Sequence, residues 1–491
     1  MAAARFMLDG ERIELEVTHP TRTLLQYLRE DLRRVGSKEG CAEGDCGACT
    51  VVIAELDGDA LRYRAVNACI QFLPTLDGKA LFSVESLKAA DGSLHPVQQS
   101  MVDHHGSQCG FCTPGFVMSM FALYHNNPAP TRADIDDALS GNLCRCTGYR
   151  SIVDACRHMY TDYDRVELDE AGLIADLLEL RRADGDGLSL ELDQARYHAP
   201  GALAELAELY LQRPDAQILA GGTDVGLWVT KQLRELPALI YLGNVAELKR
   251  IDVSAEGIEV GAAVCLTDAF DAIEPHYPEF GEMFRRFASV PVRNAGTLVG
   301  NVANGSPIGD SMPALMAVSA YARLRRGDQQ RELALEDLYL DYMKNALQAG
   351  EFIESIVIPP RADALLLRCY KLSKRYDQDI SAVCAAIALR LDGEKVSEIR
   401  IALGGMAAIP KRALQTEQAL LGKDWDESTV RMAMNNLRNE FTPLSDMRAS
   451  AGYRSRATAN LLYRFYLETR PGQALEAAAV NVFAATAAGG W

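Results

Sequence analysis

The chain has 491 residues, and at about 150 residues per domain this length predicts roughly three domains. Hydrophobic residues make up 48% and charged residues 24%, a globular composition that excludes collagen-like and wholly disordered proteins. The 50 Lys and Arg residues are outnumbered by 67 Asp and Glu residues, so the formal net charge is −17 and nucleic acid and membrane surfaces are poor expected partners. We see no apolar run of the ~20 residues that span a membrane and no signal peptide, so we expect a cytoplasmic protein.

Residues 1–83 are predicted to form a small mixed domain. Two short strands, at residues 5–8 and 12–17, flank Asp9-Gly10, a pair typical of a type I′ hairpin turn. Thr21 or Thr23 can cap a following helix whose leucines share one face. These leucines are Leu24, Leu25, Leu28 and Leu32. A glycine- and cysteine-rich loop then leads into a strand at residues 49–54.

The rest of the chain is predicted to form helical and mixed segments. Thr131 and Asp134 resemble a capping box at the start of one helix, and a hairpin is expected to turn at Asp392-Gly393. The predicted segments are a helical domain at 84–160, an acidic linker with one short helix at 161–191, a mixed domain at 192–365 and a last mixed unit at 366–485. The fold class is therefore a multidomain α+β protein.

Nine of the 12 cysteines lie in the first third of the chain, and clustered cysteines in a reducing compartment indicate metal ligands before disulfides. Cys41-x4-Cys46-x2-Cys49 with a distant Cys69 is the plant-type spacing for a [2Fe–2S] cluster. The small residues of this loop let the backbone wrap the cluster and direct N–H groups at its sulfurs. A zinc site or free buried thiols are the alternatives, although zinc prefers paired C-x2-C knuckles.

A second set of cysteines, Cys109-x2-Cys112 and Cys144-x-Cys146, directly precedes two predicted helices. The positive ends of these helix dipoles favour thiolate ligands, so the two pairs can supply four ligands inside the helical domain. Zinc is an alternative on spacing alone. The remaining cysteines are expected to be ordinary buried thiols. They are Cys156, Cys265, Cys369 and Cys384.

The residues around both cysteine sets resemble the iron–sulfur part of the xanthine dehydrogenase, or molybdenum hydroxylase, family. The matching strings are Glu39-Gly40-Cys41-Ala42-Glu43-Gly44-Asp45-Cys46-Gly47-Ala48-Cys49-Thr50, Gln108-Cys109-Gly110-Phe111-Cys112-Thr113-Pro114-Gly115 and Gly141-Asn142-Leu143-Cys144-Arg145-Cys146-Thr147-Gly148-Tyr149. The resemblance implies a β-grasp ferredoxin-like domain and a helical-bundle domain with one [2Fe–2S] cluster each. The implied ligands are Cys41, Cys46, Cys49 and Cys69 for the first cluster and Cys109, Cys112, Cys144 and Cys146 for the second.

Two glycine-rich stretches of the middle third indicate a nucleotide site, since glycines let backbone N–H groups approach a pyrophosphate. They are residues 218–225 and 292–310, and neither is the Rossmann fingerprint; a plain tight turn is the alternative for the first. Both resemble the FAD domain of the same family, an α+β domain of the vanillyl-alcohol-oxidase-like (PCMH) type, followed by that family's C-terminal flavoprotein domain. The implied FAD contacts are Leu219, Ala220, Gly221, Gly222, Thr223, Asp224, Val225, Thr297, Asn301, Asp310, Ile353 and Lys371.

The family's substrate chemistry occurs at a molybdopterin centre on a large domain, and only about 100 residues remain after the FAD unit. The resemblance therefore implies an electron-transfer subunit with a separate molybdopterin-containing subunit, expected as an (αβ)2 heterotetramer. The implied activity is NAD-dependent oxidation of xanthine to urate, with electrons passing through two [2Fe–2S] clusters and FAD to NAD⁺. The alternatives are the same type of subunit in an aldehyde or N-heterocycle hydroxylase, and a non-catalytic zinc-binding scaffold.

Overall fold

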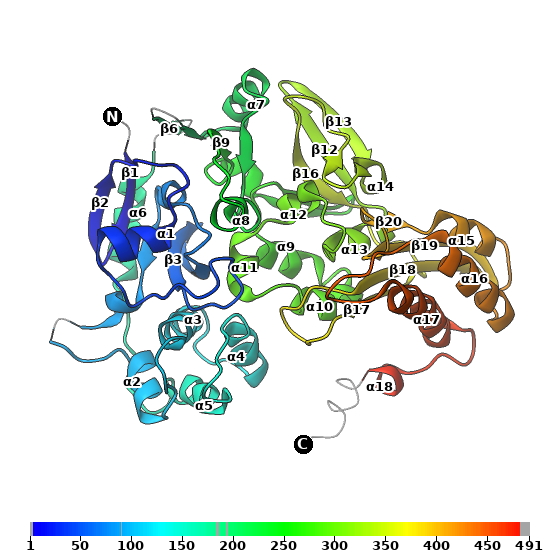
Figure 1. Cartoon of the computed structure of the whole chain (residues 1–491), viewed down its shortest axis with the longest axis horizontal. Helices are drawn as coiled ribbons and strands as arrows, with labels where there is room; N and C mark the ends of the chain where they lie inside the picture. The colour runs from blue at the N-terminus through cyan, green and yellow to red at the C-terminus, as the bar shows by residue number, and fades with distance from the viewer. Residues whose placement is uncertain (1–2, 90, 183–185, 193–194, 482–491) are drawn as a thin grey trace.

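The computed structural model describes residues 3–89, 91–182, 186–192 and 195–481. Within these residues the chain is a multidomain α+β protein, as expected, with strands in several separate sheets (Figure 1). In Figure 1 the blue and cyan N-terminal third lies on one side of the green middle of the chain, and the orange C-terminal part lies on the other. Part of the predicted acidic linker and the last ten residues, with the end of the Ala-rich tail, lie outside the described residues.

The N-terminal domain is built on a five-stranded sheet with the strand order β2-β1-β5-β3-β4. The predicted hairpin is confirmed, since β1 pairs antiparallel with β2 and both turn residues, Asp9 and Gly10, have positive φ. The strands are β1 Ala4–Leu8, β2 Glu11–Leu15, β3 Thr50–Asp57, β4 Ala60–Asn67 and β5 Ala80–Phe82.

The predicted helix after Thr23 is present but short. Thr23 caps α1, Leu24–Gln26, in a capping box with Gln26, and the chain continues as a π-helical turn, Tyr27–Asp31. Leu24, Leu25 and Leu28 are buried against the sheet, whereas the expected fourth member, Leu32, is 37% exposed. The wider π turn adds a residue per turn, which rotates Leu32 off the buried face.

The helical domain contains α2 Pro96–Asp103, α3 Thr113–Asn126, α4 Arg132–Leu139 and α5 Arg150–His158. The capping box of Thr131 and Asp134 is confirmed at the start of α4. Helix α3 is buried along most of its length because it packs against β3 and β4 of the first sheet. One hydrophobic core therefore includes Val52 and Tyr63 of the sheet together with Phe116 and Phe121 of the helix.

The acidic segment after this domain is a docked connector. Asp169 caps α6, Glu170–Leu180, which therefore starts before the predicted position near residue 173. Leu177 and Leu180 are buried in the core shared with the first sheet, and Arg182 forms an ion pair with the buried Asp77. The charged residues had suggested a solvated linker, but the apolar face of α6 packs on the N-terminal domain.

The middle of the chain forms two sheets with helices between and around them (Figure 1). The first sheet has the order β6-β7-β9-β8, and the second has the order β10-β11-β16-β12-β13. The strands of the first sheet are β6 Leu188–Glu191, β7 Arg196–Ala199, β8 Gln217–Leu219 and β9 Ala238–Tyr241. Those of the second are β10 Ile251–Ser254, β11 Gly257–Gly261, β12 Tyr321–Arg326, β13 Gln329–Ala334 and β16 Phe352–Ile358.

The helices of this part surround a large hydrophobic core. Buried side chains from the strands and from the inner faces of the helices form this core. They are α7 Leu203–Gln212, α8 Val225–Thr230, α9 Leu266–Ile273, α10 Gly281–Arg285, α11 Val290–Ala295, α12 Leu298–Asn304, α13 Ser311–Ala317 and α14 Leu335–Leu338. A two-stranded ribbon, β14 Tyr339–Asp341 with β15 Lys344–Asn345, follows α14.

The C-terminal part is a four-stranded antiparallel sheet, β17-β18-β19-β20, covered by helices. The hairpin predicted at Asp392-Gly393 is confirmed, because β18 ends at Asp392 and Gly393 takes a positive φ. The elements are β17 Leu366–Leu372, β18 Val383–Asp392, β19 Lys395–Gly404, β20 Lys411–Arg412, α15 Leu414–Leu420, α16 Glu427–Glu440, α17 Ala451–Thr469 and α18 Ala477–Val480. Among the described residues, no helix combines the length and the apolar character that a membrane crossing needs.

Candidate functional site

The four thiols of the first cysteine set meet from two segments, because Cys41, Cys46 and Cys49 lie in the loop between the π turn and β3 and Cys69 follows β4. The side chain of Cys41 lies within interaction distance of Cys46 and Cys69, and Cys69 also contacts Cys49. The backbone N–H groups of Asp45 and Cys46 donate to the Cys41 Sγ at 3.4 Å. The structure thus brings together all four thiols that the sequence pattern selects, with backbone donors directed at sulfur.

The electrostatics of these thiols favour a cationic cluster. Contacts from Cys46 and Cys69 hold the pKa of Cys41 far below its usual range, whereas the Cys41 thiol raises the pKa values of Cys46 and Cys69. One thiolate is therefore easily accommodated, but four negative charges at this spacing need positive ions between them. Four soft sulfur donors suit iron or zinc, so the donor set fits a [2Fe–2S] cluster.

Glycine is required in this loop by its close packing. A Cβ on Gly40 would lie 2.8 Å from the Cys46 Sγ, and one on Gly47 would lie 2.2 Å from the backbone oxygen of Gly141. Gly47 also has a φ of +71°, where other residues are strained. The tight loop therefore leaves room for sulfur only because these positions carry no side chain.

The second cysteine set meets where α3 and α5 begin. Cys112 directly precedes α3, and its side chain contacts Cys144, while Cys109 contacts Cys146. Burial, followed by the Cys144 contact, raises the pKa of Cys112 to about 12, so this group also needs a cation to hold it as a thiolate. Cys109 and Cys146 are exposed, so one side of this site faces the molecular surface.

The two cysteine sites are joined by direct hydrogen bonds. The Leu143 N–H, next to Cys144, donates to the Cys46 carbonyl oxygen at 3.0 Å. The buried Asn142 donates from its Nδ2 to the Gly47 carbonyl at 3.1 Å and to the Thr50 Oγ1 at 3.2 Å. Its Oδ1 accepts a hydrogen bond from the Ser119 Oγ at 2.6 Å. The pattern of cysteines alone did not reveal this bridging role of Asn142.

A cavity of about 460 Å³ lies between the two sheets of the middle part, at the glycine-rich stretches. Nine of the predicted flavin contacts line it: Ala220, Gly221, Gly222, Thr223, Asp224, Val225, Thr297, Asn301 and Ile353. A Cβ on Gly221 would lie 1.9 Å from the Ala295 backbone oxygen, and Gly222 has a φ of +74°. This turn is therefore closed tightly against α11 and presents backbone to the cavity, which fits a bound dinucleotide.

Hydrogen bonds and contacts within the chain hold the polar side chains that line the cavity. Burial raises the pKa of the Asp224 carboxyl, which contacts the side chains of Trp228 and Asn304. Thr297 caps α12 by accepting from the Gly300 N–H at 2.9 Å. The Asn301 Oδ1 accepts from the Ser311 Oγ at 2.6 Å.

Three predicted flavin contacts lie outside the residues that line the cavity. Leu219 is buried in the core of the first middle sheet. Asp310 and Lys371 form a buried ion pair with 2.5 Å between Nζ and Oδ2, and the Ser381 hydroxyl bridges them. The Asp310 Oδ1 is buried without a hydrogen-bond partner among the described residues, so this pair retains an unused acceptor beside α13.

The first cysteine site contacts the turn at Gly221 and Gly222, which is called the cavity turn below. The Gln71 Nε2, two residues after Cys69, donates to the Gly221 carbonyl at 3.2 Å. The Thr230 Oγ1 at the end of α8 donates to the carbonyl of Ala42, next to Cys41, at 2.8 Å. Neither Gln71 nor Thr230 belongs to a motif, so sequence spacing gave no sign of these contacts.

The four remaining cysteines lie outside both cysteine sites. Cys156, Cys265 and Cys384 are buried thiols as expected, whereas Cys369 is only partly buried. Cys369 lies on β17 diagonally across from Cys384 on β18, and the two side chains are in contact.

Four family descriptions match successive parts of the chain. They are "2Fe-2S iron-sulfur cluster binding domain" at residues 6–73, "[2Fe-2S] binding domain" at 83–157, "FAD binding domain in molybdopterin dehydrogenase" at 192–361 and "CO dehydrogenase flavoprotein C-terminal domain" at 368–469. The matched segments contain both cysteine sites and the cavity turn.

Whole proteins and solved structures give a consistent picture. A xanthine dehydrogenase from Emericella nidulans is 31% identical over 94% of this chain and 38% of the relative. A solved carbon monoxide dehydrogenase from Hydrogenophaga pseudoflava is 27% identical, with a TM-score of 0.52 over 56% of this chain and 96% of that chain. A quinoline 2-oxidoreductase from Pseudomonas putida 86 is 26% identical, with a TM-score of 0.52 over 58% of this chain and 100% of that chain.

The fold and the matched domains define an iron–sulfur flavoprotein, an oxidoreductase component with two [2Fe–2S] domains and one FAD-binding domain. In this order the four matched domains are similar to the small-subunit-like architecture of xanthine dehydrogenase, in the molybdenum hydroxylase family. It spans about two fifths of the length of the curated relatives that it matches.

Proposed function

We propose that the chain is the electron-transfer subunit of an NAD-dependent xanthine dehydrogenase, in which xanthine is oxidised to urate on a separate molybdopterin subunit. The observation that carries this proposal is the unbroken contact between three sites. The second cysteine site reaches the first through the Leu143 N–H and the Cys46 carbonyl, and the first reaches the cavity turn through Gln71 and Thr230.

The residues of each site are proposed to hold one group. Cys41, Cys46, Cys49 and Cys69 would hold one [2Fe–2S] cluster, and Cys109, Cys112, Cys144 and Cys146 the other. The cavity turn, Thr297, Asn301 and Ile353 would hold FAD, with Leu219, Asp310 and Lys371 as supporting residues behind it. When bound, iron–sulfur clusters carry single electrons and a flavin exchanges electrons singly or as a hydride, which suits NAD⁺ as co-substrate.

The molybdopterin-containing partner is proposed to bind at the second cysteine site. Cys109 and Cys146 are exposed there, and exposed apolar side chains surround them: Phe111, Leu143 and Tyr149. Apolar groups of this kind on a surface typically mark a contact with another protein. The solved relatives support a separate partner. In the quinoline enzyme one whole chain matches only 58% of this chain, so that chain is short and the remainder of that enzyme is carried by other chains. We propose an (αβ)2 heterotetramer in the cytoplasm.

A second candidate is the same type of subunit in a hydroxylase of aldehydes or N-heterocycles. The match to quinoline 2-oxidoreductase supports this candidate. Its TM-score against this chain is 0.52, equal to that of the carbon monoxide dehydrogenase from Hydrogenophaga pseudoflava. Both candidates use the same sites on this chain and differ only in the partner.

The test is to purify this chain with its co-purifying partner and to measure NAD⁺ reduction with xanthine, an aldehyde and quinoline as separate substrates. We expect xanthine to give the highest kcat/KM. Preference for quinoline or an aldehyde would replace the xanthine proposal with the second candidate. Absence of any substrate-dependent NAD⁺ reduction in a molybdenum-replete complex would contradict both.

A further inference from the structure

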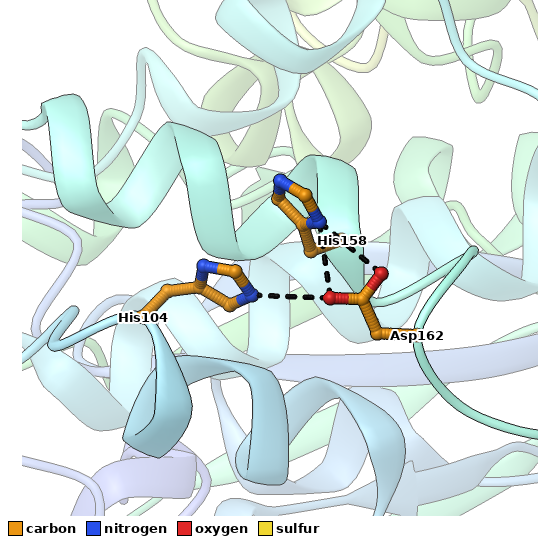
Figure 2. A group of neighbouring side chains, drawn as sticks. All are labelled: His104, His158 and Asp162. Atoms are coloured by element: carbon orange, nitrogen blue, oxygen red, sulfur yellow. Dashed lines mark hydrogen bonds and ion pairs between the residues drawn. The ribbon is translucent and has the colours of Figure 1, made fainter.

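A group of metal-ligating side chains lies on the helical domain, away from both cysteine sites. It consists of His104, His158 and Asp162, whose ligand atoms all lie within 4.8 Å of one another. Figure 2 shows the two imidazole rings side by side, each with one ring nitrogen directed at the Asp162 carboxylate. We propose that these three residues form a binding site for a divalent transition-metal ion of the zinc type.

The distances between the ligand atoms match such an ion. The His104 Nε2 lies 3.5 Å from the Asp162 Oδ2, and the His158 Nδ1 lies 3.0 Å from the same oxygen. Tetrahedral zinc with bonds of about 2.0–2.1 Å requires ligand atoms about 3.3 Å apart. Two imidazole nitrogens and one carboxylate oxygen are also the donors that zinc, copper and nickel accept, with water completing the coordination.

The fold holds the three residues in place. The Ser100 Oγ of α2 donates to the Ala155 carbonyl of α5 at 2.7 Å, in a buried contact that fixes the two helices together. His104 is the C-cap of α2 and His158 is the last residue of α5, so each follows that contact by about one helical turn. The Asp162 N–H then donates to the His158 carbonyl at 3.0 Å, which turns the carboxylate back to the imidazoles.

The surrounding charges favour a cation. Two helices end at this point, and the negative ends of their dipoles face the group. The nearby Asp103 adds negative charge, although its carboxylate already accepts from the Gln99 Nε2 and the Tyr163 Oη. The imidazole rings stack with centroids 4.3 Å apart, an arrangement in which two protonated rings would repel each other but two metal-bound neutral rings would not.

The side chains remain accessible to an ion from solvent, since His104 is 24%, Asp162 40% and His158 45% exposed. A bound ion would connect α2, α5 and the first residues of the connector. His104 also begins the loop that leads to Cys109, so the ion would fix the start of the loop that carries one ligand of the second cysteine site. The site is therefore proposed to be a structural metal site that stabilises the helical domain.

The test compares the cluster-replete chain with three variants after equilibrium dialysis against Zn²⁺, with zinc and iron measured in the same sample. His104→Gln and His158→Gln keep a hydrogen-bond donor but remove a ligand. His105→Asn is the matched control, because the neighbouring His105 is exposed and its φ of +55° suits asparagine. The parent chain and His105→Asn are expected to retain about one zinc per chain more than the other two variants.

Equal zinc content in all four proteins of unchanged iron content would overturn the proposal and leave an ordinary hydrogen-bonded cluster. Anomalous diffraction at the zinc absorption edge provides a second measurement on the parent chain. A peak between His104, His158 and Asp162 would support the site, and zinc located only at the cysteines would contradict it. Zinc should also raise the Tm of the parent chain and of His105→Asn, and leave that of both Gln variants unchanged.

Discussion

Asn142 shows how much single residues contribute to the link between the two cysteine sites. Its amide is buried, and every hydrogen bond it makes reaches a different segment: the Gly47 loop, Thr50 on β3 and Ser119 on α3. A buried amide with satisfied donors and acceptor fixes distance as well as orientation. The spacing between the two cysteine loops therefore depends in part on one side chain, two residues before Cys144, in addition to the hydrogen bond between Leu143 and Cys46.

The partition of the cysteines leads to the first prediction. Cys144→Ser removes a thiolate whose neighbours are Cys112, Cys109 and Cys146, so only the second cluster should be lost. We expect the iron content to fall by about half, since each cluster contributes two irons. EPR spectra of the reduced variant should keep the plant-type signal, and bound FAD should remain. Loss of both signals from a folded chain would show that the ligands are shared differently.

The buried His95 and the half-buried His125 lead to a prediction about pH. Burial lowers the pKa of His95 to about 4 and that of His125 to about 3. Because an unfolded histidine titrates near pH 6.5, the unfolded chain binds protons before the folded chain as the pH falls. The stability contributed by neutral His95 is complete above about pH 6.5 and decreases on acidification, by about 2 kcal/mol at pH 5.

His95→Asn tests this dependence, because asparagine keeps an acceptor at the N-cap of α2, where the His95 Nδ1 accepts from the Val97 N–H. Thermal midpoints measured by circular dichroism should fall less between pH 7 and pH 5 in the variant than in the parent chain. His105→Asn, at an exposed position, should keep the parent's slope. Equal slopes in all three proteins would mean that His95 is not responsible for acid sensitivity.

At the scale of elements, the turn between β8 and α8 positions the proposed flavin site. Gly221→Ala should lower FAD affinity at least about tenfold, because the new Cβ would lie 1.9 Å from the Ala295 backbone oxygen and push the turn out of place. Gly452→Ala is the matched control, since a Cβ there meets nothing within 4 Å. The ratio of flavin to protein after gel filtration measures the effect. Full FAD occupancy in Gly221→Ala would rule out this turn as a flavin contact.

Elements with local signals could be predicted from the sequence. The hairpin at Asp9-Gly10 and the capping box of Thr131 and Asp134 depend on residues at most three positions apart, and both are present. The cysteine sets were also predictable, because the short spacings of Cys41, Cys46 and Cys49 and of each later pair are typical of cluster ligands, although the fold brings Cys69 to the first three and joins the two pairs. By contrast, α1 gives way to a π turn and Leu32 leaves the buried face, a detail decided by packing under the sheet rather than by periodicity.

The contacts between elements could not be read from the sequence. Asn142 meets Gly47 over 95 residues of separation, and Gln71 meets Gly221 over 150. Polar residues of this kind have no periodic pattern, and their partners exist only after the domains pack. The same reason explains why the acidic connector looked solvated, although α6 buries Leu177 and Leu180 against the first domain.

At the scale of the whole molecule, the segments share cores instead of standing apart. The N-terminal sheet packs on α3 with one face, while Ala4 of β1 joins residues of β6, β7, β8 and β9 in another buried cluster. An ion pair between Arg64 and Asp268, 2.6 Å apart, adds a polar contact between the first domain and the middle part. Such continuous packing keeps the three proposed cofactor sites at constant separations.

The metal content of the whole chain is the fourth prediction. Eight thiolates in two cluster sites imply about four irons and four labile sulfides per chain after anaerobic purification, with two distinct EPR signals on reduction. Protein with zinc at the cysteines and no iron would instead support the scaffold alternative. Colour gives a rapid first indication, because iron–sulfur flavoproteins are brown.

The division of work between this chain and its partner is the last prediction. If the flavin site is complete on this chain, the flavin-replete chain alone should pass electrons from NADH to an artificial acceptor dye, and its flavin absorbance should bleach under anaerobic NADH. It should not oxidise xanthine until the molybdopterin partner is added, because that chemistry is proposed to lie on the other subunit. Substitution of Asp224 or Asn301, which line the cavity, should lower FAD occupancy and NADH–dye activity together and leave both cluster signals unchanged. An NADH–dye rate at background level in flavin-replete, partner-free protein would contradict either NAD⁺ as the acceptor or a flavin site contained in this chain. Dithionite reduction separates the two outcomes. If dithionite bleaches the flavin absorbance, the flavin is present and NADH is not its electron donor.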